Sequence, residues 1–149
     1  MKNRGITLIE VIVYISLILV TFFISSKSYR FILEKERLKK EVVEITSSFR
    51  KNQKKSEIYG EYIPIYFDLE KKEIFFGKNN LKLSDEFIYL SKNKSDIANF
   101  ERYFTENGNL NRGFNLLILN KSGNLLAEIS FDSSNSISYP VITVKGIKL

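Results

Sequence analysis

The sequence predicts an α+β protein in which a long N-terminal helix, transmembrane in its first half and amphipathic in its second, packs on an antiparallel β-sheet domain of two small sheets. Three observations predict this class. Residues 6–24 contain one ionisable side chain in 19 positions, helical apolar spacing continues to Phe49, and short β-rich runs follow Lys55. We expect four segments: a short N-terminal segment (1–5), the transmembrane half of the helix (6–26), its amphipathic half (27–55) and an extracytoplasmic β-rich domain (56–149).

The segment 6–26 is apolar enough to predict a membrane helix. A hydrocarbon core of about 30 Å needs roughly 20 apolar residues, and no Gly or Pro interrupts the chain from Ile6 to Lys55. Because Lys2 and Arg4 precede the segment, we expect a cytoplasmic N-terminus and an exported remainder. A cleavable secretory signal fits less well, since the apolar run is long for a signal core and residues 25–28 offer a weak cleavage site.

The segment 27–55 has one apolar face. Phe31, Leu38, Val42, Ile45 and Phe49 recur at intervals of 7, 4, 3 and 4, which places them on one side of an α-helix. The opposite side is charged. We therefore expect these five side chains to pack the helix on the β-rich domain.

The segment 56–149 reads as short strands separated by turn residues. Residues 62–68 and 73–76 predict a hairpin, in which Pro64 is typical of an edge strand. Many of the runs are apolar on both faces, which favours two packed sheets over one open sheet. The remaining predicted strands are 87–90, 99–105, 114–119, 125–131 and 138–144.

The composition excludes most enzyme chemistry. Cys and His are absent, so thiol nucleophiles, disulfides, imidazole bases and the commonest metal ligands are missing. The carboxylates are scattered, and no pair has a spacing that commits both to one site. Asp96 and Asp132 lie near Asn residues but lack the alternating acidic spacing of a calcium loop. We expect no catalytic residues, no cofactor and no metal.

The positive charge lies on the N-terminal part of the chain. The net charge is +6, with 12 Lys/Arg and 5 Asp/Glu up to Lys55, and 11 and 12 after it. Basic residues on the helix could attract phosphates, but a solvated face between packed helices explains them better. Nucleic acid is therefore an open but not a favoured partner.

Glu10 is the one ionisable residue of the apolar run, and such a carboxylate usually has a partner or a function. Gly5-Ile-Thr-Leu-Ile-Glu10, preceded by Lys2 and Arg4, resembles the class III signal of type IV prepilins and pseudopilins. The resemblance implies that a prepilin peptidase cuts after Gly5 and N-methylates Ile6. It also implies that Glu10 serves assembly by pairing with a neighbouring subunit's terminal amine.

Two positions depart from the commonest family pattern. Ile6 stands where Phe is most frequent, and Lys27 stands where many major pilins have a helix-bending proline. The second departure favours a minor pilin or pseudopilin. Residues 103–131, with Gly108, Gly113 and Gly123, are similar to the C-terminal region of H-type pseudopilins of type II secretion and of D-type competence pseudopilins, although residues 134–136 lack a glycine.

The resemblance implies a structural subunit of a type IV pilus, competence pseudopilus or type II secretion pseudopilus. Its partners would be prepilin peptidase, other pilin or pseudopilin subunits, and the cell membrane before assembly into an extracytoplasmic filament. Two alternatives stay open: a filament-tip subunit that contacts DNA or a secreted substrate, and a plain single-pass membrane protein with an exported β domain.

Overall fold

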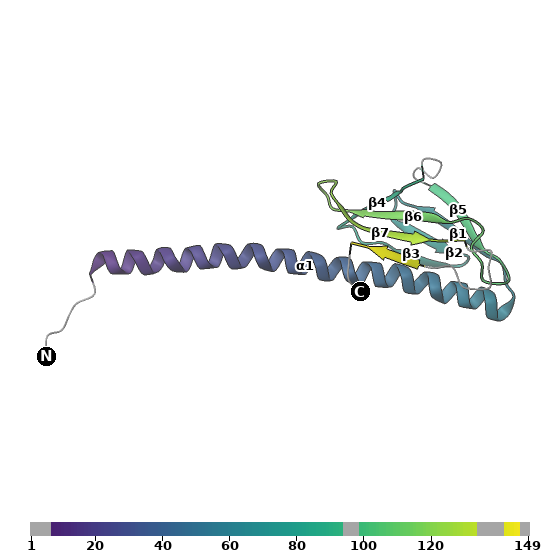
Figure 1. Cartoon of the computed structure of the whole chain (residues 1–149), viewed down its shortest axis with the longest axis horizontal. Helices are drawn as coiled ribbons and strands as arrows, with labels where there is room; N and C mark the ends of the chain where they lie inside the picture. Colours follow the sequence, from purple (N-terminus) through teal and green to yellow (C-terminus); the bar gives the residue numbers. More distant parts are fainter. Residues whose placement is uncertain (1–6, 94–98, 134–141, 147–149) are drawn as a thin grey trace. The chain divides into compact units, whose positions relative to one another are not determined.

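The chain divides into two compact units, Met1–Arg37 and Leu38–Leu149. Figure 1 shows the computed structural model, which describes residues 7–93, 99–133 and 142–146; the side chains of 24–28, 30–31 and 142–143 lie outside the description. The helix α1 (Leu8–Tyr59) contributes residues to both units. All described strands belong to the second unit.

Two four-stranded antiparallel sheets form the second unit. One has the order β3-β2-β1-β5 and the other the order β4-β6-β7-β8. The predicted α+β class with two antiparallel sheets is therefore confirmed. The strands are β1 (Ile63–Asp68), β2 (Glu73–Phe76), β3 (Asn79–Lys82), β4 (Ile88–Ser91), β5 (Asn99–Phe104), β6 (Phe114–Leu119), β7 (Leu125–Phe131) and β8 (Ile142–Lys145).

The predicted transmembrane half of the helix is wrong. Among the described residues, the structure contains no helix whose length and apolar character would let it cross a membrane. From Glu34 onward α1 carries charged residues in almost every turn, and a charged side chain at the centre of a bilayer costs about 2.5–3.5 kcal/mol.

Pro64 lies in an interior strand, contrary to the edge position predicted for it. Strand β1 has β2 on one side and β5 on the other. The backbone allows this because β2 ends at Phe76, opposite Ile65, before the register reaches Pro64. Beyond that end, the carbonyl of Pro64 accepts a hydrogen bond from the N–H of Gly77 at 2.9 Å. Because Pro64 has no N–H, it can only accept here, and no hydrogen bond of the β1–β2 pair is lost.

Strand β3 was not predicted from the sequence. Its residues Asn79 to Lys82 have little β propensity, and only Leu81 is buried. The strand forms because Gly77, at φ 59°, closes a tight turn that returns the chain onto β2.

The C-terminal end of α1 is fixed to the domain by backbone contacts. Gly60, at φ 61°, follows the last helical residue, and the N–H of Glu61 donates to the carbonyl of Ser56 at 3.1 Å, as in a Schellman motif. The fully buried Ser56 hydroxyl donates to the carbonyl of Thr105 in the β5–β6 loop. A Cβ on Gly108, in the same loop, would lie 3.2 Å from the Cβ of Glu57.

Candidate functional site

The apolar half of α1 is exposed on every side. Every described residue from Leu8 to Phe23 is exposed. Twelve large apolar side chains between Leu8 and Phe22 are 41% to 79% exposed. A helix that is hydrophobic all round is normally buried, and full burial of such a side chain stabilises by about 1.5–3 kcal/mol. This surface is therefore a strong candidate for intermolecular contact.

Glu10 lies in the first turn of α1 and completes a capping box with Thr7. The hydroxyl of Thr7 accepts from the N–H of Glu10 at 3.4 Å, and the carboxylate of Glu10 accepts from the N–H of Thr7 at 3.3 Å. These reciprocal bonds satisfy donors that a helix start leaves without partners, and a carboxylate is favourable near that end of the dipole. Glu10 thus has a local structural role in addition to any role in assembly.

Three of the predicted site residues cannot be placed. Gly5 and Ile6, the predicted cleavage and methylation positions, lie outside the described residues. The side chain of Phe31 lies outside them as well.

The other four members of the predicted stripe lie in the core of the second unit. Leu38, Val42, Ile45 and Phe49 are each at most 5% exposed. The ring of Phe49 contacts both sheets. Its centroid lies 4.3 Å from that of Phe131 in β7 and 4.9 Å from that of Phe76 in β2, with Phe67, Phe104 and Phe114 within 6.2 Å.

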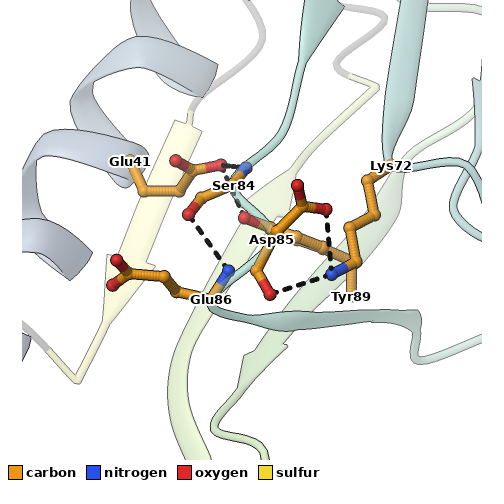
Figure 2. A network of polar contacts seen from close by, with 6 residues as sticks. All are labelled: Glu41, Lys72, Ser84, Asp85, Glu86 and Tyr89. Carbon is orange, nitrogen blue, oxygen red and sulfur yellow. Dashed lines mark hydrogen bonds and ion pairs between the residues drawn. The ribbon is translucent and has the colours of Figure 1, made fainter.

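Glu41 is a buried carboxylate on the same helix, and its burial was not predicted from the sequence. It is 8% exposed and accepts from the hydroxyl of Tyr89 at 2.6 Å and from the N–H of Ser84 at 3.0 Å, as Figure 2 shows. Burial, and then the bond to Glu41, raises the pKa of Tyr89. Because Ser84 lies between β3 and β4, Glu41 fixes the segment in which the chain passes from one sheet to the other.

The same segment carries an exposed ion pair. The ammonium of Lys72 lies 3.5 Å from the carboxylate of Asp85 and donates to the Asp85 carbonyl at 3.1 Å (Figure 2). The N–H of Glu86 donates to the hydroxyl of Ser84 at 3.2 Å. These bonds order the turn around Glu41. The side chains that make them do not form a pair of nucleophile and base in one pocket.

Contacts within the domain lower the pKa of two carboxylates, Asp68 and Glu128. The backbone N–H of Lys71, at 2.9 Å, and then its ammonium lower the pKa of Asp68. Lys92, at 2.8 Å, and Asn115, at 2.7 Å, lower the pKa of Glu128. Over the described ranges, no three His, Cys, Asp or Glu side chains gather closely enough to hold a metal ion.

A depression of about 330 Å³ lies on the outer face of the β3-β2-β1-β5 sheet. Its walls are exposed or half-buried side chains of β1, β5 and the residues beside them, on the face opposite the core, whereas Ile65 and Arg102 in its lining are buried. Its aromatic character was not recognised from the sequence, although the alternation in YIPIY (62–66) is visible there. The lining residues are Tyr62, Pro64, Ile65, Tyr66, Glu101, Arg102, Tyr103 and Asn111.

Fold and site together define this chain as an α+β protein with an uncovered apolar helical segment and a separately closed two-sheet core. No family model, no curated protein and no solved structure matches it.

Proposed function

We propose that this chain is a non-enzymatic structural subunit of a filament of the type IV pilin kind, a minor pilin or pseudopilin. The observation that carries this proposal is the apolar surface of α1 from Leu8 to Phe22, exposed on every side. A second unit with its own buried core stands in the same chain.

Other subunits are the partners best suited to cover that surface. The second unit buries its own apolar stripe, including Val42 and Phe49, so it needs no partner to complete its core. The helical segment has one charged residue, Glu10 at its start. The hydroxyls of Ser16 and Thr21 donate to carbonyls of the helix itself, so few polar groups face a soluble ligand. Packing against equally apolar helices satisfies it, because helix-on-helix burial needs only complementary side chains.

The pattern at the start of the chain adds chemistry to this packing. Under the proposal, prepilin peptidase cuts after Gly5, N-methylates Ile6, and leaves a terminal amine that pairs with Glu10 of a neighbouring subunit. Assembly takes place outside the cytoplasm. The capping box limits the cost of the unpaired state, since Glu10 already accepts from the N–H of Thr7.

Mass spectrometry of the N-terminus tests the processing step. Coexpression with a prepilin peptidase should give a mature chain that begins at methylated Ile6. An intact Met1 terminus, or a cut near Ser26, would contradict the proposal.

Three variants separate the charge of Glu10 from its capping role. Glu10→Gln keeps a capping-box residue but removes the charge, whereas Glu10→Ala removes both. Thr7→Val removes the hydroxyl and keeps the charge. If charge pairing drives assembly, filament incorporation should be lost in both Glu10 variants and retained in Thr7→Val. Incorporation of Glu10→Gln at the wild-type level would show that Glu10 acts as a helix cap.

A further inference from the structure

The depression on the outer face of the β3-β2-β1-β5 sheet plays no part in the proposed filament packing. We propose that it is a binding site for an uncharged sugar ring. This inference stands on the second unit alone and does not depend on filament assembly.

The walls of the depression are aromatic. Tyr62 and Tyr103 have ring centroids 4.7 Å apart and planes inclined by 37°, which makes one continuous aromatic ledge. Tyr66 lies on the same face of β1, 37% exposed, and its ring centroid is 6.2 Å from that of Phe75, its cross-strand neighbour in β2. Aromatic faces carry partial negative charge, so they attract the polarised C–H groups on the flat face of a pyranose.

Pro64 lies between these walls. It is exposed, stands opposite Tyr103 in the register, and separates Tyr62 from Tyr66 along β1. Its short side chain leaves space where its neighbours project. The resulting volume of about 330 Å³ lies at the lower end of the range for small-molecule sites, which is about 300–1,000 Å³.

The rim supplies one fixed donor and one acceptor. The side-chain carbonyl of Asn111 accepts from the backbone N–H of Tyr103 at 3.0 Å, and the backbone N–H of Asn111 donates to the Tyr103 carbonyl at 3.1 Å. These bonds orient the Asn111 amide and leave its NH₂ group for a ligand. Glu101, exposed and next to Tyr103 on β5, adds a carboxylate that only accepts.

The charges favour a neutral ligand. The lining residues include one acid, Glu101, and one base, Arg102. Arg102 is 6% exposed, and its guanidinium carbon lies 5.0 Å from the ring centroid of the buried Phe100. Its guanidinium therefore lies on the core side of the sheet, where a ligand in the depression does not contact it directly. Among the described residues that line the depression there is no lysine, so no exposed cation faces a ligand there.

The acceptor at the rim distinguishes a sugar from a proline-rich peptide. An extended peptide of that kind presents mainly carbonyl oxygens, which the carboxylate of Glu101 repels. Vicinal hydroxyls of a sugar both donate and accept. They match the pair formed by the Glu101 carboxylate and the Asn111 amide.

Saturation-transfer NMR on the full chain tests this site. The protein is held in a zwitterionic, sugar-free detergent because of its apolar segment. The probes are the methyl glycosides of glucose, galactose, mannose and N-acetylglucosamine, and the strongest is then titrated calorimetrically. We expect Tyr62→Ala to weaken its binding about threefold to tenfold, and Glu101→Gln to weaken it as well.

Tyr59→Ala is the matched control, because Tyr59 is 68% exposed and lies outside the depression. It should leave binding within about twofold of wild type. Circular dichroism should show both tyrosine variants folded, as expected for exposed side chains. The proposal is overturned if no glycoside binds the wild-type chain, if Tyr62→Ala and Tyr59→Ala have equal effects, or if a proline-rich peptide binds at these residues and the glycosides do not.

Discussion

Between Leu8 and Phe23 every described residue of α1 is exposed, whereas between Leu38 and Phe49 the same helix buries four apolar side chains and one carboxylate. The first stretch is apolar on all sides, and the second has one apolar stripe and a charged back. Helical structure is common to both. Under the proposed function, one part of the helix serves association with other subunits and another part completes the core of its own domain.

The largest expected effect comes from a substitution in the part of α1 that completes the core of the second unit. Phe49→Ala removes a ring that contacts five other aromatic rings in two sheets, so it should lower the free energy of unfolding of the second unit by about 3–5 kcal/mol. Chemical denaturation measures it. Val43→Ala, on the exposed side of the same helix, should change stability by less than about 0.5 kcal/mol. A loss below about 1 kcal/mol for Phe49→Ala would mean that the helix does not complete the core.

Glu41→Ala tests the polar part of the same interface. It leaves the Tyr89 hydroxyl and the Ser84 N–H without their acceptor, which should cost about 1–3 kcal/mol. Glu44→Ala is the control, because Glu44 is exposed one turn away. Equal denaturation midpoints for the two variants would show that the buried carboxylate contributes nothing to stability.

Gly108 and Gly123 separate backbone strain from close packing. Both have positive φ, 74° and 82°, so alanine should cost about 1–2 kcal/mol of strain at either position. Only at Gly108 would the new Cβ meet the helix, at 3.2 Å from Glu57. Thermal denaturation should therefore show a larger loss for Gly108→Ala. The packing of this loop on α1 would be refuted by a larger loss at Gly123.

Alkaline pH should destabilise the second unit through Tyr89. Its pKa is raised in the folded state by burial and by Glu41, whereas an unfolded tyrosine titrates near pH 10. Above about pH 10 the unfolded chain therefore binds fewer protons, and stability falls by about 1.4 kcal/mol per pH unit from this group. Tyr89→Phe should have a shallower slope between pH 10 and 11. An unchanged slope would assign alkaline unfolding to other groups.

The smallest expected change in stability follows a substitution in the exposed apolar part of α1, Leu8–Phe23. Ile15→Ser alters a side chain that is 53% exposed, so the unfolding of the second unit should change by less than about 0.5 kcal/mol. Incorporation into filaments should nevertheless fall. Ile45→Ser, in the buried stripe, is the matched change and should unfold the domain readily. The comparison fails if Ile15→Ser destabilises the domain as much as Ile45→Ser does.

Features that depend on residues close together in the chain could be predicted from the sequence. The absence of Gly and Pro from Ile6 to Lys55 indicated a continuous helix, and the spacing of Leu38, Val42, Ile45 and Phe49 indicated which face is buried. The pattern Thr7-Leu-Ile-Glu10 contained the capping box too, because both partners lie within one turn. From the sequence, Glu10 was assigned to assembly alone, so its role as a helix cap was not predicted.

Features that depend on residues far apart in the chain could not be predicted, because they arise from strand pairing and packing. Glu41 looks like one more solvated charge in the sequence, and its burial requires donors 43 and 48 residues away. Strand β3 and the interior position of Pro64 follow from the order in which the strands pair, and the aromatic depression joins residues of β1 to residues of β5. Local periodicity specifies the face that a residue occupies within its own element. It does not specify which element packs against that face, because that choice depends on the pairing of all strands at once.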